Sequence, residues 1–401
     1  MREKAFKFNY SYKNRKRSNS PRGKFSGQRK GLRPQSEIEI SKYVKKTVGN
    51  ITKEEYVSKT NFSELDINPK LKNNILSKGY TKPTPIQDQT IPEILEGKDI
   101  LGIANTGTGK TAAFLIPLIE KVLKNKFEKV LIMAPTRELA LQINDELKEL
   151  SKSLGIYSAT CIGGASIRYQ ILLLNRNPNF VIGTPGRLKD LVNRKYLNLS
   201  KFKNIVLDEV DRMLDMGFIN DIKHLVALLP SPRQSLFFSA TISKEADSLI
   251  KGFLSSPVKI SVKSGDTAEN VEQDIVKVVD KSKKIDSLHD LLIKDEFKKV
   301  LIFGRTKRGV ENLSRDLRER GFKVDSIHGD KSQSRREKVL GLFKANKIQS
   351  LVATDVAARG LDIADITHVI NYDLPATYED YVHRIGRTGR ANKTGKALTF
   401  V

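Results

Sequence analysis

The feature that most constrains the fold of this chain is the alternation of short apolar runs with longer helical patterns. Apolar runs of four residues or fewer are typical of strands buried on both faces of a parallel sheet. Such runs occupy 100–103, 130–133, 180–182, 205–207 and 236–238. Helical patterns separate them, for example over 113–123 and 138–150. This order of elements predicts repeated βαβ units and therefore an α/β fold.

The same alternation resumes later in the chain, with a second series of predicted strands at 300–303, 324–327, 351–353, 368–370 and 397–401. Between the two series it lapses over 263–270 (KSGDTAEN), a polar stretch that we predict to be a linker. Two series with one pattern predict two similar domains, each with a parallel sheet flanked by helices. A chain of 401 residues is long enough for two such cores. We therefore predict one domain over 51–262 and a second over 271–401.

A basic segment precedes the first predicted domain. Residues 1–50 hold 15 Lys/Arg and 3 Asp/Glu, which gives them +12 of the formal net charge of +25. They lack apolar periodicity over 1–36, so we predict a disordered basic tail. Aromatic residues among the basic ones favour contact with single-stranded nucleic acid. A solubilising or organelle-targeting role fits the same composition.

The remaining positive charge lies in the two predicted domains and indicates a polyanionic partner. Charge alone does not separate RNA from DNA or from an acidic membrane surface. No apolar run approaches the roughly 18–20 residues of a bilayer-spanning helix, and the N-terminus has no apolar signal-peptide core. The lone Cys161 excludes an internal disulfide, and its apolar neighbours predict a buried thiol. We expect a monomeric, cytoplasmic protein.

A glycine-rich segment between the first apolar run and a helical pattern predicts a phosphate-binding loop. Its glycines allow backbone N–H groups to surround a phosphate, and the N-terminus of the following helix favours negative charge. Lys110 can reach the outer phosphates, and the Thr111 hydroxyl can bind Mg²⁺. Ala104 stands where the general pattern has its first glycine. The predicted nucleotide-binding residues are Ala104, Asn105, Thr106, Gly107, Thr108, Gly109, Lys110 and Thr111.

An acidic quartet, Asp208–Glu–Val–Asp211, follows the predicted strand at 205–207. One carboxylate at a strand end can hold Mg²⁺, and its neighbour can deprotonate an attacking water. An isolated acidic quartet is more often a solvated turn or a helix cap. Together with the phosphate loop, the quartet predicts a metal site formed by Asp208 and Thr111.

Several short motifs occur in a fixed order, and together they resemble the DEAD-box family of RNA helicases. The resemblance extends over about 60–401 and implies two RecA-like domains that bind ATP and RNA. The motifs are GYTKPTPIQ at 79–87, PTRELA at 135–140, TPGR at 184–187, DEVD at 208–211, SAT at 239–241, ATDVAARGLD at 353–362 and HRIGRTGR at 383–390. Val210 and Asn105 depart from the residues usual in this family, but neither is a proposed ligand.

The resemblance assigns roles around the nucleotide. Gln87 is expected to read adenine, because its amide both donates and accepts, as the N6/N7 edge of adenine requires. The resemblance therefore implies that the nucleotide site prefers ATP over GTP. Phe62 and Tyr80 are expected near the base, and Asp362 at the ribose. Lys110, Thr111, Asp208 and Glu209 match the phosphate, metal and water-activating positions.

Further implied roles couple the nucleotide to RNA. Asp211, Ser239, Thr241 and His383 are expected to link the two sites. Arg387 and Arg390 are expected to act as arginine fingers, since arginine makes forked contacts with phosphate oxygens. The implied catalytic residues are therefore Lys110, Asp208, Glu209, Arg387 and Arg390.

The resemblance also implies a set of RNA contacts made by hydroxyls, glycine backbones and arginines. Such groups favour phosphate and sugar, so binding is expected to be independent of base sequence. The implied contacts are Thr136, Arg137, Gly163, Gly164, Thr184, Gly186, Arg187, Arg305, Gln333, Arg336, Thr354 and Gly360.

We expect an enzyme that uses ATP to close two domains on single-stranded RNA, open a short duplex locally, and release RNA after hydrolysis. An RNA-clamping or annealing protein that depends on ATP binding rather than turnover is the alternative. A motor that acts on DNA is a more distant one.

Overall fold

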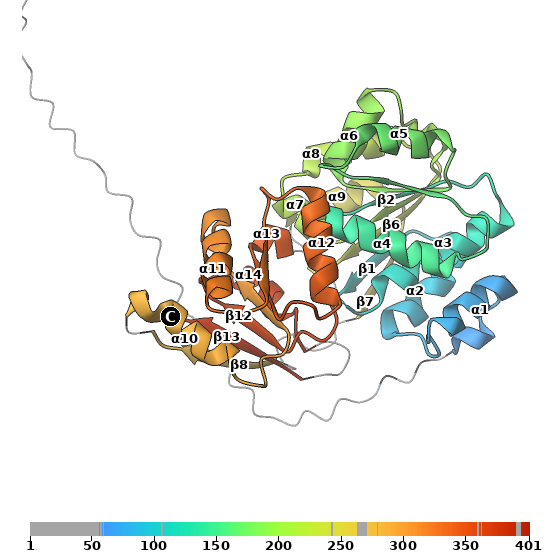
Figure 1. Cartoon of the computed structure of the whole chain (residues 1–401). Helices are drawn as coiled ribbons and strands as arrows, with labels where there is room; N and C mark the ends of the chain where they lie inside the picture. The colour runs from blue at the N-terminus through green and yellow to red at the C-terminus, as the bar shows by residue number, and fades with distance from the viewer. Residues whose placement is uncertain are drawn as a thin grey trace, which may run out of the picture. The chain divides into compact units, whose positions relative to one another are not determined.

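The computed structural model describes residues 56, 58, 60–105, 107–241, 244–262, 271–278, 280–358, 361, 363–389 and 394–401 (Figure 1). The predicted tail at 1–50 and linker at 263–270 lie outside these residues. The predicted α/β fold with two parallel sheets is confirmed by the strand pairing. No helix in the described part of the chain combines the length and apolar character that a membrane crossing requires.

The first sheet has seven strands in the order β3-β4-β2-β5-β6-β1-β7, and all of its pairs are parallel. Its central strands are buried along their whole length, which explains their unbroken apolar sequences. The strands are β1 Ile100–Ala104, β2 Val130–Met133, β3 Ser158–Cys161, β4 Phe180–Gly183, β5 Asn204–Leu207, β6 Gln234–Ser239 and β7 Val258–Val262.

Two hydrophobic clusters cover this sheet, because successive residues of a strand point to opposite faces. In β2, for example, Leu131 belongs to one cluster and Ile132 to the other. Figure 1 shows α3 and α4 on one side of the sheet. The helices are η2 Phe62–Glu64, α1 Pro69–Ser77, α2 Pro85–Leu95, α3 Lys110–Lys124, α4 Arg137–Leu150, α5 Ile167–Asn175, α6 Pro185–Asn193, η3 Leu199–Lys201, α7 Val210–Asp215, α8 Ile219–Ala227 and α9 Lys244–Phe253.

The second sheet has six parallel strands in the order β10-β11-β9-β12-β13-β8. Its strands are β8 Val271–Val276, β9 Val300–Phe303, β10 Val324–Ile327, β11 Ser350–Ala353, β12 His368–Asn371 and β13 Gly395–Phe400. Its helices are η4 Lys281–Lys283, α10 Lys284–Leu292, α11 Lys307–Glu319, α12 Gln333–Lys344, α13 Asp355–Ala358 and α14 Tyr378–Ile385.

Parallel strands bring their carboxyl ends to one edge of a sheet, and ligands commonly bind there. The loop after β1 carries the phosphate-binding segment, the loop after β5 carries the acidic quartet, and β6 ends at Ser239. Cys161, the last residue of β3, is fully buried as predicted, and burial raises the pKa of its thiol to about 12.

Candidate active site

The phosphate-binding segment forms a tight turn between β1 and α3. Gly109 caps α3 in the left-handed region at φ 92°, which a residue with a side chain would adopt only under strain. Lys110 starts the helix, and its Nζ donates to the carbonyl of Ala104 at 2.6 Å and that of Asn105 at 3.3 Å. The Thr108 hydroxyl donates to the same Asn105 carbonyl at 2.8 Å. Thr106 lies outside the described residues.

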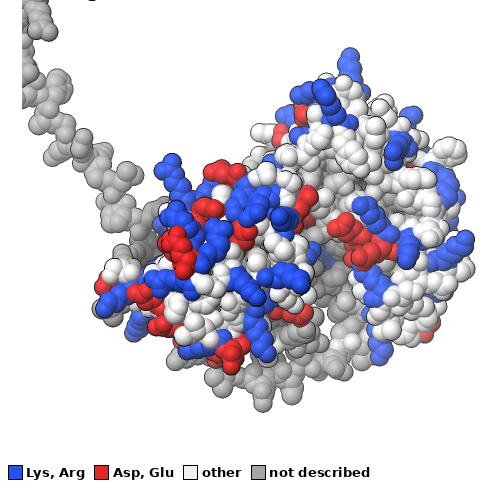
Figure 2. All heavy atoms as spheres, viewed as in Figure 1, with Lys and Arg blue, Asp and Glu red and all other residues white. Residues whose placement is uncertain are grey.

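The segment borders a cavity of about 390 Å³. Gly107, Gly109, Lys110 and Thr111 line one part of it, with Asp208 and Glu209 beside them. Asp145, Glu146 and Glu149 of α4 line another part, and Figure 2 shows acidic side chains gathered over this helix. Asn105 and Thr108 stabilise the loop rather than line the cavity.

Gln87 is buried, and both ends of its amide have partners. Its Oε1 accepts from the Thr84 backbone N–H at 2.9 Å and thereby caps α2. Its Nε2 donates to the Gly109 carbonyl at 3.1 Å, so the amide is joined directly to the phosphate-binding turn. These two bonds leave one N–H and one oxygen lone pair of the amide for contact with a base.

The two aromatic residues expected near the base lie next to each other. Phe62 is 1% exposed and packs in the core of the first domain, with its ring centroid 6.1 Å from that of Tyr80. The Tyr80 hydroxyl donates to Glu146 at 2.9 Å, and Tyr80 lines the cavity. The position of Tyr80 at the cavity fits its expected role, whereas Phe62 supports Tyr80 from the interior.

The first two acids of the quartet are buried beside the phosphate-binding turn. Asp208 is 2% exposed, and its Oδ1 accepts from the Glu209 backbone N–H at 3.0 Å. Burial, opposed by the charge of Lys110 and assisted by that of Glu209, raises the pKa of Asp208 to about 7. Glu209 has φ 53°, a strained value for a residue with a side chain. A backbone held in this way fixes the direction of its carboxylate.

Arg212, which the sequence did not single out, pairs with Glu209. Its Nη1 donates to Glu209 Oε2 at 2.8 Å, and both side chains are almost fully buried. Its Nη2 lies 3.4 Å from Nδ1 of His383 in α14. Burial and the nearby Arg212 lower the pKa of His383 to about 4, so the ring is neutral near pH 7. Because a guanidinium only donates, Nδ1 accepts and the ring proton lies on Nε2.

Asp211 joins the quartet to the segment that follows β6. Its Oδ2 accepts from the backbone N–H groups of Ala240 and Thr241 at 3.1 and 2.9 Å, and from the Thr241 hydroxyl at 3.1 Å. The Asp211 backbone N–H donates to the Ser239 hydroxyl at 3.3 Å. Three of the four residues expected to couple nucleotide and RNA therefore form one hydrogen-bonded cluster, and the fourth, His383, contacts Arg212.

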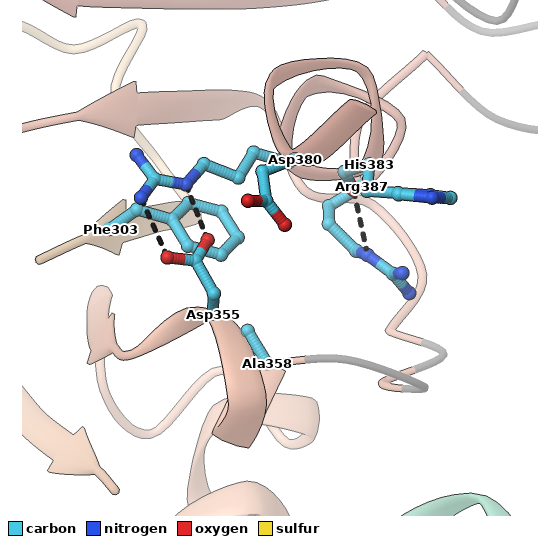
Figure 3. A pocket seen from close by; sticks show the side chains of 7 residues that line it. Phe303, Asp355, Ala358, Asp380, His383 and Arg387 are labelled. Atoms are coloured by element: carbon cyan, nitrogen blue, oxygen red, sulfur yellow. Dashed lines mark hydrogen bonds and ion pairs between the residues drawn. The ribbon is translucent and has the colours of Figure 1, made fainter. Parts of the chain in front are cut away.

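The arginines of the last motif occupy different environments. Arg384 is a buried residue of α14 whose Nε and Nη2 donate to the two Asp355 oxygens at 2.5 and 2.8 Å (Figure 3). Its Nη1 donates to the Asp373 carbonyl at 2.6 Å. Arg387 is 3% exposed, and its Nη1 donates to the Leu361 carbonyl at 2.7 Å. Arg390 and the expected ribose contact Asp362 lie outside the described residues.

The expected RNA contacts of the first domain follow strands β2, β3 and β4. The Thr136 hydroxyl caps α4 by accepting from the Leu139 N–H at 3.2 Å. Arg137 packs against Gly163 and Gly164, where an added Cβ on Gly164 would lie 2.2 Å from Nη1. These two glycines therefore allow the guanidinium to lie close to the backbone. Thr184, Gly186 and Arg187 lie at the start of α6, and Arg187 donates to the Gln170 side chain at 3.1 Å.

In the second domain, the expected RNA contact Arg336 pairs with Glu138 of α4 at 2.8 Å, and both are buried. Gln333 at the start of α12 donates to Glu337 at 3.1 Å. Arg305 follows β9, and its backbone N–H donates to Asp373 at 2.8 Å. Thr354 follows β11 and is buried. Gly360 lies outside the described residues.

Two family models match the chain. A model described as DEAD/DEAH box helicase matches residues 84–249, and one described as helicase conserved C-terminal domain matches residues 283–392. A curated protein of Listeria monocytogenes named ATP-dependent RNA helicase CshA is 49% identical over 344 residues, which cover 85% of this chain and 66% of that protein. The protein of that name from Geobacillus kaustophilus is 46% identical over 85% of this chain and 73% of its own length. The chain thus spans about two thirds of the first of these relatives.

Solved structures agree with these matches. Dbp5 of Saccharomyces cerevisiae bound to RNA and ADP BeF3 superposes with a TM-score of 0.75 at 30% identity, over 85% of this chain and 89% of that one. Mss116p bound to single-stranded RNA and AMP-PNP superposes with a TM-score of 0.77 at 29% identity, over 85% and 75% of the two chains.

Proposed function

Because the chain belongs to the DEAD-box helicase family, we propose that it is an ATP-dependent RNA helicase that opens short RNA duplexes locally. The observation that carries this proposal is the cluster at the edge of the first sheet. There the phosphate-binding turn and Asp208 line one cavity, and Asp211 joins the acidic quartet to the 239–241 segment. A change at the γ-phosphate can therefore reach the quartet and, through Asp211, the 239–241 segment.

Lys110 binds the outer phosphates of ATP once its Nζ leaves the carbonyls of Ala104 and Asn105. The two carbonyls are neutral acceptors, whereas phosphate oxygens are charged. Because charged acceptors bind a cation more tightly, the hydrogen bonds of Lys110 become stronger when it binds ATP. The backbone N–H groups at 107–111 surround the same phosphates, as the glycines at 107 and 109 permit.

Mg²⁺ would be held by Asp208 and the Thr111 hydroxyl. These residues fit the ion, because burial makes the negative charge of Asp208 unfavourable until a cation lies beside it. In the described part of the chain no cluster of three or more His, Cys, Asp or Glu is placed to hold a metal, so phosphate oxygens and water would complete the coordination. Bound Mg²⁺ neutralises charge on the phosphates.

Glu209 accepts a proton from the attacking water while the water oxygen bonds to the γ-phosphorus and the bond to ADP breaks. Its strained backbone and its pair with Arg212 hold the carboxylate in one orientation. Orientation of this kind contributes to rate because a base must lie within hydrogen-bond reach of the proton that it accepts.

Arg387 and Arg390 stabilise the charge that develops on the γ-phosphate. Arg387 must first leave the Leu361 carbonyl, and Arg390 belongs to the same motif. Gln87 recognises adenine with the N–H and the oxygen lone pair that its bonds to Thr84 and Gly109 leave over. Tyr80 stands at the cavity, Phe62 supports its ring, and Asp362 contacts the ribose.

RNA binds by its phosphates and sugars to both domains, independently of base sequence. The contacts in the first domain come from Thr136, Arg137, Gly163, Gly164, Thr184, Gly186 and Arg187. Those in the second come from Arg305, Gln333, Arg336, Thr354 and Gly360. Arg336 reaches RNA by leaving Glu138. The protein acts as a monomer in this proposal, and its cytoplasmic location stays a prediction from the sequence.

The test is the rate of ATP hydrolysis with no nucleic acid, with single-stranded RNA, and with single-stranded DNA of the same sequence. We expect RNA to raise the rate at least tenfold and DNA to leave it near the basal value. Equal stimulation by DNA would indicate a motor that acts on DNA. ATP-dependent RNA binding without any stimulation of hydrolysis would indicate an RNA clamp.

A further inference from the structure

A cavity of about 170 Å³ lies in the first domain, away from the phosphate-binding turn. Leu174, Pro178, Val181, Leu197 and Phe202, all buried, form its apolar floor. A polar rim surrounds this floor, formed by the exposed residues Asn177, Tyr196, Asn198 and Lys201. An apolar floor with a few polar groups at its mouth is the usual form of a small-ligand site.

The rim offers hydrogen-bond donors. Asn198 Oδ1 accepts from the Ser200 N–H at 3.0 Å, and Asn177 Oδ1 accepts from Lys129 at 2.7 Å. These contacts use one lone pair of each amide oxygen, whereas neither Nδ2 group has a partner among the described residues. Lys201 adds a charged donor, and no Asp or Glu lines the cavity. A ligand that fits this rim therefore presents acceptor atoms and negative charge.

Lys129 forms part of the wall without being available to a ligand. Its Nζ donates to the carbonyls of Asn177 and Pro178 at 2.8 and 2.6 Å, as well as to Asn177 Oδ1. Burial and the positive charge of Lys201 lower the pKa of Lys129. The lysine holds the Asn177–Pro178 turn in place and adds positive potential beneath the rim.

The cavity lies at the far end of α6 from the proposed RNA contacts. Helix α6 begins at Pro185, next to Thr184 and Arg187, and ends at Asn193. Nine residues of helix span about 14 Å. The segment that follows, 194–203, supplies half of the residues that line the cavity and holds four Lys/Arg with no Asp/Glu. Arg187 and Arg194 at the two ends of α6 both pair with Asp190, so the net positive charge next to the cavity comes from the lysines at 195, 201 and 203.

We propose that this cavity binds an unpaired nucleotide of the RNA, beyond the segment held by the two domains. The base would enter the apolar floor beside the Tyr196 ring, its carbonyl and ring-nitrogen acceptors would face the Asn177 and Asn198 amides, and Lys201 would bind the adjoining phosphate. Proteins recognise unstacked bases by this combination of apolar contact, aromatic ring and amide donors. This proposal rests on the proposed function, since it extends the same RNA site.

The charge of the surroundings favours RNA over a protein segment. Within 124–129, three lysines accompany Glu128, and Phe127 is 88% exposed. Tyr157 is 63% exposed at the start of β3, beside Asn179, which joins Tyr157 to the 126–128 turn. Exposed rings among lysines suit a flexible polyanion with stacking bases. An acidic peptide would also present acceptors to the rim, but it lacks the regularly spaced flat bases that stack on exposed rings.

The experiment compares two single-stranded RNAs, one of about 6 and one of about 15 nucleotides, in binding assays with the full chain. The variants are Tyr196→Ala and Lys201→Glu, and the controls are Tyr196→Phe, which keeps the ring, and Lys259→Glu, an exposed lysine on the edge strand β7. We expect Tyr196→Ala and Lys201→Glu to weaken binding of the long RNA about fivefold or more. Binding of the short RNA should stay within twofold, and the controls should behave as wild type.

Photocrosslinking with thiouridine RNA provides a second measurement that does not depend on a variant. The long RNA should crosslink to 194–203 and the short RNA should not. Unchanged binding of the long RNA by both variants, or no crosslink in this segment, would overturn the proposal. Short RNA that still stimulates ATP hydrolysis in the same samples would show that the proposed function stands without this site.

Discussion

The guanidinium of Arg212 donates to the carboxylate of Glu209 at 2.8 Å, and the two side chains are only 3% and 5% exposed. Removal of one partner would leave the other charge buried without compensation, which typically costs about 3–5 kcal/mol. Each charge of the pair therefore needs the other and, because Glu209 is the proposed base, the pair holds its carboxylate in one orientation.

Arg212→Gln is expected to lower kcat at least tenfold with small changes in the affinities for ATP and RNA. It is also expected to lower the melting temperature. The double variant Arg212→Gln/Glu209→Gln separates the two effects, since it removes both charges and should recover stability without recovering turnover. A single variant that hydrolyses ATP like wild type would show that Arg212 does not position the base.

Two arginines three residues apart should respond differently to the same substitution. Arg387→Lys is expected to reduce RNA-stimulated turnover by about 10³–10⁵, because an ammonium cannot reproduce the planar contact on phosphate oxygens. Its melting temperature should change little. Arg384→Lys, the matched comparison, breaks the two-bond pair with Asp355 and should mainly lower the melting temperature. Turnover of Arg387→Lys within a few-fold of wild type would remove Arg387 from the transition state.

Gln87 should control the choice between ATP and GTP. Gln87→Ala removes the amide that is proposed to recognise adenine. It is expected to weaken ATP binding roughly 5–100-fold while GTP binding changes little. Gln87→Glu is the sharper variant, because a carboxylate oxygen can still accept from the Thr84 N–H but cannot donate. The test measures the affinities of both variants for ATP and GTP. Variants that still exclude GTP would show that another residue recognises adenine.

Asp208 should make the nucleotide-free protein less stable as the pH rises. Its pKa is about 7 in the folded protein against 3.8 ordinarily, so the folded chain holds more protons than the unfolded chain between these values. Stability contributed by the protonated acid is therefore lost as the pH rises from about 4 through about 7.

Asp208→Asn removes this loss and is expected to raise the melting temperature relative to wild type at pH 8, by about 2–4 °C for each kcal/mol. The difference should shrink toward pH 5, where most of the wild-type acid is protonated. Melting curves of nucleotide-free wild type and Asp208→Asn at pH 5 and pH 8 measure this difference in melting temperature. An equal difference at both values would mean that Asp208 does not titrate in this range.

Most strands were predictable because their residues are buried on both faces. Strands β3, β7 and β8 were not predicted, since they are only partly buried and their polar residues interrupt any apolar run. The contact of Asp211 with Ser239 and Thr241 agrees with the motif order, since β5 and β6 are neighbours and their carboxyl ends meet. Arg212 escaped prediction because a basic residue three positions after an acid usually lies on a solvated helix face. Here the short helix α7 turns that face into the interior.

The different environments of Arg384 and Arg387 could not be predicted from the sequence either. Both belong to one motif, HRIGRTGR at 383–390. Helix α14 ends at Ile385, so Arg384 lies in the helix and pairs with Asp355, whereas Arg387 lies in the turn after the helix. The pairs of Gln87 with Gly109 and of Arg336 with Glu138 depend on tertiary contacts that no local pattern specifies. The sequence thus identified the motifs, and the structure shows which members are engaged before ligands bind.

If hydrolysis of ATP drives repeated opening of RNA duplexes, the Glu209→Gln variant should not separate strands repeatedly. A short duplex with a single-stranded extension is followed under multiple-turnover conditions with ATP, for wild type and variant at equal concentration. We expect wild type to separate many duplexes per enzyme. Glu209→Gln leaves Arg212 without its carboxylate, so the assay is run below the melting temperature of the variant. The variant should bind ATP and RNA but stall on the RNA after a single event, because an amide cannot accept the proton. Multiple turnovers by Glu209→Gln at the wild-type rate would show that repeated strand separation does not depend on proton transfer to Glu209.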